Sequence, residues 1–329
     1  MTSVTFSRRH LLASVGGLAL TAGLPVRAAD PWPAKPLRII VPFGPGGPAD
    51  LSARALGELI APQLGQPIVV ENRPGGGSAV GVMAAAQARD GHTLLMGSNS
   101  MVINPILNPA LAYDVERDFD AVAMVSAQPL VLVVPATAKA QTIQDLIAEA
   151  KAQPGALTAG NSGNATLAHL TAELFAIQTG TTITSVSYKG EAALMPDLIA
   201  ARVAFGFLNL PTLLPHLRSG RLRALAVSQA MPHPDLPNVP TLRALGFAAL
   251  EVQGFAALLA PKGSIPPEGL SRLEGVLSKA LGGEVMAGRF AALGVAPVAS
   301  TRASTAQTLK AEAARWQQVI KARGIKAEG

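Results

Sequence analysis

The sequence contains no cysteine among its 329 residues, and only 4% of its residues are aromatic. Without cysteine the chain can form neither disulfides nor thiolate metal sites, and it has no thiol nucleophile. Charged residues make up 15% of the chain and hydrophobic residues 49%. A disordered chain would show the opposite balance, so the composition predicts a folded protein with a buried core. The length suggests about two domains, since domains usually contain roughly 100–200 residues.

The first 28 residues have the pattern of a signal peptide. Arg8 and Arg9 precede an uncharged, apolar stretch over residues 11–24. A membrane-spanning helix needs roughly 20 such residues, so the shorter stretch favours a secretory signal over a membrane anchor. Small residues at the two ends of 26–28 (Val-Arg-Ala) then suit a signal peptidase. The arginine pair is also typical of twin-arginine export, and the pattern leaves both export routes open.

Much of the positive charge belongs to this segment. Removing it removes Arg8, Arg9 and Arg27 and no acid, so the net charge falls from +6 to +3. The remaining basic residues come closest together over 217–223, where no aromatic residue is interleaved to stack on a base. We therefore expect no nucleic-acid binding. No second apolar run reaches spanning length, and we expect a soluble, exported protein.

Short β-forming runs alternate with helical patterns along the rest of the chain. Strands are predicted over residues 37–41, 67–71 and 93–97, with helices over 51–60 and 81–88 between them. A second strand–loop–helix unit follows, and the remaining elements alternate in the same way. Its strand is predicted over 156–159 and its helix through 170–177, followed by strands over 183–186, 203–208, 224–228 and 256–260 and a last helix over 309–322.

This alternation predicts an α/β protein with parallel-rich sheets flanked by helices. Two units of like construction suggest two lobes with a ligand site in the cleft between them. Long β-type stretches near 122–134 and 250–260 are placed to cross between the lobes, the first interrupted by polar residues and a proline at 126–129. We expect residues 29–128 to form the first part of lobe 1, 129–252 lobe 2, and 253–329 the rest of lobe 1.

Three loops of glycine and small polar residues follow strands and precede helices, over residues 42–48, 97–100 and 161–166. Helix N-termini present free N–H groups and the positive end of the helix dipole, so they attract anions. Each loop alone reads as an ordinary capped turn. Their recurrence at strand ends of a parallel sheet favours a site for a small carboxylate or another polar solute. Asp50 is placed to cap the helix after the first loop.

The first loop also matches a dinucleotide-binding pattern. Residues 44–49 fit G-x-G-x-x-A, and Glu71 ends the next strand where a ribose-binding acid would lie. Pro45 and Pro48 lack the N–H groups that a pyrophosphate needs, and export disfavours a soluble nicotinamide cofactor. An exported dinucleotide-dependent oxidoreductase is the alternative function. No two histidines have metal-ligand spacing and no nucleophile elbow occurs, so we expect no enzyme, metal or cofactor.

Ordered motifs cover nearly the whole chain after residue 32. They are PAKPLRIIVPF (33–43), GGPAD (46–50), VENRPG (70–75), DGHTLL (90–95), SYKG (187–190), NLP (209–211), GRLRALAV (220–227), PNVPT (237–241) and LAP (259–261). In this order and spacing the chain resembles the Bug family, the extracytoplasmic solute receptors of tripartite tricarboxylate transporters. Each motif alone is weak, but the ordered set is specific.

The resemblance implies a monomeric periplasmic receptor with a two-lobed Venus-flytrap fold and no cofactor. It implies that two pincer loops hold a small solute, often a carboxylate, through backbone amides and ordered waters, for delivery to membrane subunits of the transporter. The matching ligand-binding positions are Phe43, Gly46, Gly47, Asp50, Ser98 and Asn99 in the first lobe and Ser162, Gly163, Asn164, Thr166, His169, Tyr188, Lys189, Gly190 and Asn209 in the second.

The chain departs from the family pattern at four of these neighbouring positions. Ala165 replaces a usual glycine, and Leu167 and Ala168 replace residues that are usually small and often polar. Leu208 stands where the family usually has an aspartate, which commonly lies near the solute. Its absence removes a negative charge from the expected cleft and argues against an amino-bearing solute. Lys189 has an alternative role as a charge at the rim of the cleft.

Overall fold

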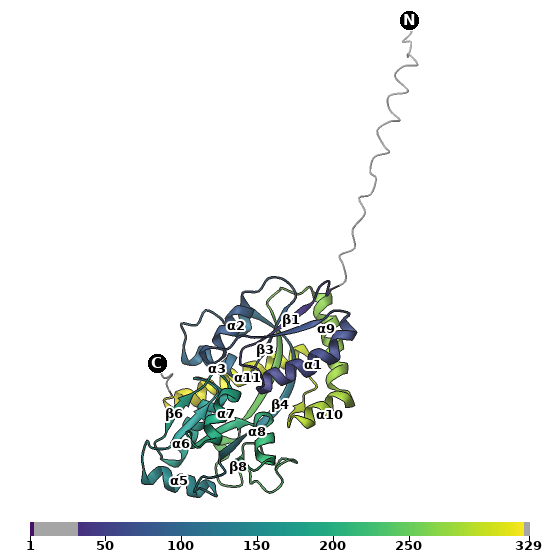
Figure 1. The fold of residues 1–329 in the computed structure, drawn as a ribbon. Coiled ribbons are helices and arrows are strands. Elements are labelled where there is room, and N and C mark those ends of the chain that lie inside the picture. The colour runs from purple at the N-terminus through teal and green to yellow at the C-terminus, as the bar shows by residue number, and fades with distance from the viewer. Residues whose placement is uncertain (3–31, 326–329) are drawn as a thin grey trace. The chain divides into compact units, whose positions relative to one another are not determined.

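The alternating pattern builds a parallel sheet in the first third of the chain (Figure 1). β1 (Leu37–Val41) lies between β2 (Ile68–Asn72) and β3 (Thr93–Gly97) and pairs with both in parallel. α1 (Pro48–Leu64) and α2 (Ala79–Ala86) make the crossovers between these strands. The βαβαβ unit predicted from the sequence is confirmed, with element boundaries shifted by a few residues.

The computed structural model describes residues 1–2 and 32–325. The predicted signal peptide over residues 1–28 lies, apart from its first two residues, outside the described residues and stays a prediction. In the part that is described, no helix is long and apolar enough to cross a membrane.

One long strand joins the two sheets. Residues 119–129 of β4 (Phe119–Pro135) pair antiparallel with β9 (Gln253–Pro261), which also pairs with β3, whereas the last residues of β4 pair in the second sheet. The predicted interruption at 126–129 is wrong, because β4 continues through it with two register shifts just before it. The polar side chains there have partners, and the Ser126 hydroxyl lies 3.2 Å from that of Ser52.

The second sheet repeats the design of the first. β5 (Thr158–Asn161) pairs in parallel with β6 (Thr184–Ser187) and β7 (Phe205–Asn209), and β7 and β8 (Leu222–Val227) pair antiparallel with the end of β4. Its helices are α5 (Ile143–Ala152), α6 (Leu167–Thr179), α7 (Glu191–Ile199) and α8 (Leu210–Arg218). Figure 1 shows α5, α6 and α8 at one end and α1, α2 and α9 at the other, with β4 between them.

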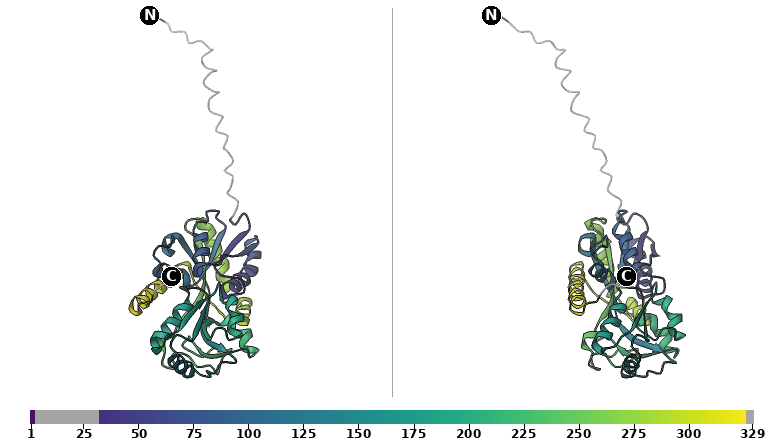
Figure 2. Two further views of the ribbon diagram at one scale, coloured as in Figure 1. Left: turned by 60° about the vertical axis from the view of Figure 1, so that its left-hand side comes forward. Right: turned by 90° about the vertical axis from the view of Figure 1, so that its left-hand side faces the viewer.

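The C-terminal helices return to the first sheet. α9 (Pro267–Leu281) packs against α1 and β4, and α10 (Glu284–Ala292) packs against α1 and the short β10 (Ala296–Pro297). α11 (Arg302–Arg323) is longer than the predicted last helix and packs against β4 and α3 (Asn99–Leu107) at the side of the molecule (Figure 2). The remaining short helices are η1 (Gly76–Ser78), α4 (Val115–Asp118) and η2 (Ala248–Leu250).

Helices on both faces of the first sheet explain its hydrophobic strands. In β1, Leu37 and Ile39 face the apolar cluster that contains Leu56 of α1, whereas Ile40 faces the cluster that contains Val82 of α2. Fully burying a side chain such as isoleucine contributes roughly 1.5–3 kcal/mol relative to its exposure. Strands buried on both faces therefore lack the polar alternation of a half-exposed sheet, and the predicted α/β class is confirmed.

Candidate functional site

Five helices begin at one pocket. Their N-cap residues all line it, and each follows the carboxyl end of a strand. They are Gly47 of α1, Ser98 of α3, Thr166 of α6, Gly190 of α7 and Asn209 of α8. Each N-terminus presents N–H groups without intrahelical partners and the positive end of a helix dipole. The pocket is therefore suited to an anion that accepts hydrogen bonds from backbone.

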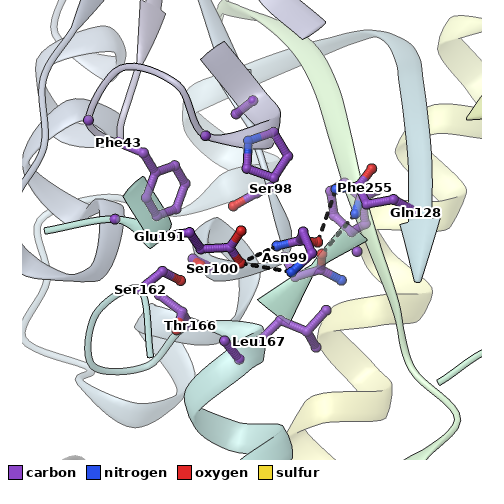
Figure 3. A pocket seen from close by; sticks show the side chains of 18 residues that line it. Phe43, Ser98, Asn99, Ser100, Gln128, Ser162, Thr166, Leu167, Glu191 and Phe255 are labelled. Atoms are coloured by element: carbon purple, nitrogen blue, oxygen red, sulfur yellow. Dashed lines mark hydrogen bonds between the residues drawn. The ribbon is translucent and has the colours of Figure 1, made fainter. Parts of the chain in front are cut away.

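The walls of the pocket come from both sheets (Figure 3). Phe43 and Ser98 lie on the side of the first sheet, Ser162 and Leu167 on the side of the second, and Phe255 comes from β9. Among the described residues that line it, Glu191 is the only one with an ionisable side chain. In the described part of the chain, no group of three or more acidic or histidine side chains could hold a metal ion.

The cleft is closed, because backbone from one side touches backbone from the other. A Cβ atom added at Gly44 would lie 3.1 Å from the carbonyl oxygen of Lys189. A Cβ added at Gly163 would lie 3.2 Å from the Cα of Gly77, and one at Gly77 would overlap the carbonyl oxygen of Asn164. The overlap excludes a Cβ atom at Gly77 in this closed arrangement, and the contacts at Gly44 and Gly163 leave little room for one.

The structure brings eight of the predicted ligand-binding residues to the pocket and leaves seven outside its lining. Those that line it are Phe43, Gly47, Ser98, Asn99, Ser162, Thr166, Gly190 and Asn209. Those outside are Gly46, Asp50, Gly163, Asn164, His169, Tyr188 and Lys189. Four of the seven, Gly163, Asn164, Tyr188 and Lys189, line a second, neighbouring hollow together with Phe43 and Ser162. Solute contact by any of the fifteen stays a prediction.

Asp50 fixes the first loop. It is not the N-cap of α1 predicted from the sequence, because that helix begins two residues earlier at Pro48. Its buried carboxylate accepts hydrogen bonds from the Gly46 N–H at 2.9 Å, the Asn72 amide at 3.0 Å and the Arg54 guanidinium at 2.9 Å. Burial alone would raise the pKa of Asp50, but the hydrogen bonds from Arg54, Gly46 and Asn72 outweigh it and hold the pKa below its ordinary value.

The second loop is fixed by its own side chains. The Thr166 hydroxyl donates to the carbonyl of Gly163 at 2.7 Å and accepts from the N–H of His169 at 3.3 Å. The buried His169 ring accepts the N–H of Ala165 at 3.1 Å through Nδ1. Ala165 has a φ of 59°, in the left-handed region that favours glycine. The hydrogen bond from Ala165 to the His169 ring therefore stabilises the loop. It holds Ala165 in a left-handed backbone conformation that costs less energy for glycine than for alanine.

Two other predicted residues have structural partners. Asn99 accepts the Phe255 N–H at 3.1 Å and donates to the Gln253 carbonyl at 3.1 Å, which ties α3 to β9. Tyr188 donates its hydroxyl proton to Asp197 at 2.7 Å. Burial raises the pKa of Tyr188, and the Asp197 carboxylate raises it further.

Sequence reasoning missed a chain of three side chains at the pocket. Gln128 Nε2 donates to Asn209 Oδ1 at 3.2 Å. The Asn209 backbone N–H and side-chain Nδ2 both donate to Glu191 Oε1, at 3.0 and 2.7 Å (Figure 3). Only Asn209 was predicted, from the family motif. The sequence shows Glu191 directly after the Ser-Tyr-Lys-Gly motif. An acid in the first turn of a helix is usually exposed and interacts with the positive end of the helix dipole, so the position alone gave no sign of a pocket.

Glu191 differs from such an exposed acid because it is only 3% exposed. Burial raises the pKa of its carboxyl, and the two N–H groups of Asn209 offset part of that rise. The nearby Thr212 hydroxyl offsets the rise in the same way. The loss of a negative charge at position 208 is therefore offset by a second acid that the prediction did not consider. Leu208 is buried in the apolar core, and Glu191 supplies the carboxyl.

Fold and site together define a class of protein. Two α/β lobes that share a long strand, with helix N-termini around a closed pocket, have the architecture of periplasmic solute-binding proteins. Residues 52–325 match the tripartite tricarboxylate transporter family receptor, and the chain belongs to this family of periplasmic solute-binding receptors. The resemblance to Bug receptors and the predicted two-lobed fold are both confirmed.

Three relatives illustrate the similarity. Protein BugT of Bordetella pertussis is 39% identical over 322 residues, which cover 96% of this chain and 98% of BugT. The structure of R. palustris Rpa4515 with adipate has a TM-score of 0.86 at 31% identity and covers 90% of this chain and 99% of that one. The structure of MatC from Rhodopseudomonas palustris with bound malate has a TM-score of 0.83 at 27% identity and covers 88% and 99%.

Proposed function

We propose that this receptor captures a small organic carboxylate in the closed cleft and presents it to the membrane subunits of a tripartite tricarboxylate transporter. The observation that carries the proposal is the convergence of five helix N-termini on one pocket that no lysine, arginine or histidine lines among the described residues. The adipate and malate bound by the two structural relatives support a carboxylate as the solute.

Backbone groups suit this task. A lobe that closes on a solute must bind it tightly enough to favour closure and still release it to the transporter. N–H groups at helix N-termini are held in place by the helices, so little reorganisation is needed when a carboxylate arrives. A bidentate arginine would bind the same group through two further charged hydrogen bonds. We infer that the affinity for the solute comes from the oriented N–H dipoles of the helix N-termini. We also infer that the membrane subunits of the transporter recognise the closed form of the receptor.

Export and organisation complete the proposal. The receptor would reach the periplasm through the signal peptide over residues 1–28, act as a monomer and catalyse no reaction. The lobes would comprise residues 29–128 with 253–329, and residues 129–252. The change of β4 from one sheet to the other after residue 129 supports the boundary between residues 128 and 129.

The oxidoreductase alternative is disfavoured by the loop over residues 44–49. At Gly44 the loop lies against the carbonyl oxygen of Lys189, an acceptor that cannot donate a hydrogen bond to a pyrophosphate. Glu71, the candidate ribose-binding acid, forms ion pairs with Arg38 and Arg73. Pro48 occupies the first position of α1 and offers no N–H.

A thermal-shift screen tests the proposed function. We expect one or a few mono-, di-, tri- or pyridine carboxylates to raise the Tm of the protein lacking residues 1–28, by mass action on the folded state. Calorimetry should then give one site per chain. A nicotinamide dinucleotide titrated in parallel should cause no shift. A shift with the dinucleotide, and none with any carboxylate, would contradict the proposal.

Thr166→Ala tests the second loop. Because the hydroxyl caps α6 and bonds Gly163, its loss should lower stability by about 1 kcal/mol. It should also lower solute affinity about tenfold, since the loop loses its fixed geometry, as measured by calorimetry. Thr142→Ala is the matched control, because Thr142 caps α5 and does not line the pocket. Equal affinity loss in both variants would remove this loop from the site.

A further inference from the structure

The C-terminal helix α11 contacts the pocket through Asn99, although none of the described residues of the helix lines it. The Asn99 amide donates from Nδ2 to Glu312 Oε2 at 3.2 Å and to the Gln253 carbonyl at 3.1 Å. Its Oδ1 accepts the Phe255 N–H at 3.1 Å. Asn99 is buried, and Asn99 and Phe255 both line the pocket. Glu312 of α11 therefore holds the pocket wall from outside.

The Asn99 amide has one orientation that satisfies these partners. Turning it over would place its N–H groups against the Phe255 N–H and its oxygen against the Gln253 carbonyl. Glu312 must then act as an acceptor, and its Oε2 also accepts Trp316 Nε1 at 3.2 Å. Without that oxygen, one donor of the buried Asn99 amide would lose the partner it has in the described structure, which is costly.

A second side chain of α11 holds the same stretch of chain. Arg315 Nη2 donates to the Glu251 carbonyl at 2.7 Å, and Arg315 Nη1 lies 3.6 Å from Glu312 Oε1. Residues 251–255 lead from lobe 2 of the proposed division into β9, and we call them the crossing segment. Arg315 thus binds one end of the crossing segment directly, and Glu312 binds the rest of it through Asn99.

The crossing segment has little room on its pocket side. A Cβ atom added at Gly254 would lie 2.5 Å from Asn209 Oδ1 and 3.1 Å from Gln128 Nε2. Both of these side chains line the pocket, as do Gly254 and Phe255. The segment is therefore packed between pocket side chains and the contacts to α11, so a small displacement of it changes the shape of the pocket wall.

We propose that Glu312 and Arg315 of α11 are positioning residues for solute binding. Acting through Asn99 and the Glu251 carbonyl, they hold the N-terminus of α3 and the crossing segment in the arrangement that binds the solute. This inference rests on the proposed function and adds to it two residues that do not touch the solute. Asn99 is the first residue of α3, so its placement also sets the N–H groups that this helix presents. Hydrogen bonds weaken steeply on misalignment, so binding through such groups tolerates little displacement.

Calorimetry tests the inference with propionate, adipate, citrate and nicotinate, one from each class of the thermal-shift screen, and the tightest binder serves as the probe. Glu312→Leu removes the acceptor for Asn99, and affinity should fall about tenfold or more. Glu312→Gln keeps an oxygen there, so affinity should stay within about threefold. Arg315→Met releases the Glu251 carbonyl and should lower affinity about threefold to tenfold, which keeps the test open if Glu312→Leu fails to fold.

Glu274→Leu and Lys310→Met are the matched controls. Glu274 accepts the Arg302 N–H at 2.9 Å and so holds the start of α11. Lys310 is a cation of the same helix that forms an ion pair with Glu116. Neither control residue lines the pocket or bonds the crossing segment in the described structure. Any loss of stability in urea unfolding should leave their affinity within about threefold of the wild-type value.

Amide hydrogen exchange gives a readout that a general loss of stability does not move. In the solute-free protein, the Phe255 N–H should exchange at least about tenfold faster in Glu312→Leu than in Glu274→Leu. The reason is that Asn99 Oδ1, the acceptor of this N–H, is no longer held in place from α11.

The outcomes separate this inference from the proposed function. Unchanged affinity in Glu312→Leu and Arg315→Met, or an equal loss in the two controls, overturns the inference and leaves the proposed function in place. A loss in Glu312→Gln as large as in Glu312→Leu also overturns it, because the acceptor oxygen would then not be the cause. Lower affinity without faster exchange at Phe255 overturns it too, since the effect would not pass through Asn99. Absence of binding by every carboxylate of the screen overturns both.

Discussion

Gly77→Ala is expected to lower solute affinity about 100-fold, which corresponds to about 2.7 kcal/mol. The added Cβ would overlap the carbonyl oxygen of Asn164 in the closed cleft, and both atoms belong to backbone-anchored positions that cannot rotate away. Only a wider separation of the two sides relieves the overlap. Because the solute is held from both sides, a ligand that must bind a partly open cleft loses the contacts of one side.

Gly76→Ala is the matched control for this variant. Gly76 and Gly77 are neighbours in η1 with φ values of 55° and 58°, so alanine pays a similar left-handed backbone cost at each. A Cβ at Gly76 would lie 3.4 Å from Ala79 and meets nothing across the cleft. Both variants should lose similar stability, and only Gly77→Ala should lose affinity in calorimetry. Equal affinities would show that contact with Asn164 is not needed for binding.

The sequence predicts best those features that depend on neighbours along the chain. The run Leu37–Val41 and the glycine-rich loop after it identify β1 and its end, because both signals are local, whereas the start of α1 was predicted three residues too late. The capping box of α5, in which Thr142 and Asp145 bond each other's backbone, is legible in the same way. The two-lobed fold with its cleft is predicted by the ordered set of family motifs rather than by any single local pattern.

Features that depend on distant contacts were not predictable. Polar residues at 126–129 indicate a break, yet Ser126 finds Ser52, 74 positions away, and β4 continues. Glu191 has the sequence context of an exposed first-turn acid, and only the meeting of α7 with β7 buries it against Asn209. Asp50 is a partial case, since Pro48 is a visible signal for the first helical position and would have placed the cap at Gly47, three residues before Asp50.

Asp50→Asn is expected to destabilise the folded protein by about 2–3 kcal/mol at pH 7. The amide would place a donor against the Gly46 N–H or the Arg54 guanidinium, each of which now donates to the buried carboxylate. Urea unfolding followed by circular dichroism measures the loss. Solute affinity should fall as well, because the same bonds fix the loop that carries Phe43 and Gly47 to the pocket.

Asp145→Asn provides the matched control. Both aspartates occupy the third position of a helix and accept the N–H of the residue four positions earlier, at 2.9 Å in Asp50 and 3.0 Å in Asp145. Asp145 is exposed and has no cationic partner in the described structure, so its substitution should destabilise the protein much less. Similar losses in the two variants would mean that burial and the Arg54 contact add nothing at Asp50.

The pH dependence of this stability loss distinguishes removal of the Asp50 charge from a disturbance of packing. The hydrogen bonds to Asp50 hold its folded-state pKa below that of the unfolded chain, so the stabilisation is complete above the unfolded value of about 3.9. It is lost as the pH falls through the lower folded-state pKa, because the carboxyl then binds a proton in both states. The difference between the wild-type protein and Asp50→Asn should therefore be largest at neutral pH and shrink on acidification. A difference that stays constant down to pH values of about 2 would show that the variant disturbs packing rather than the buried ion pair.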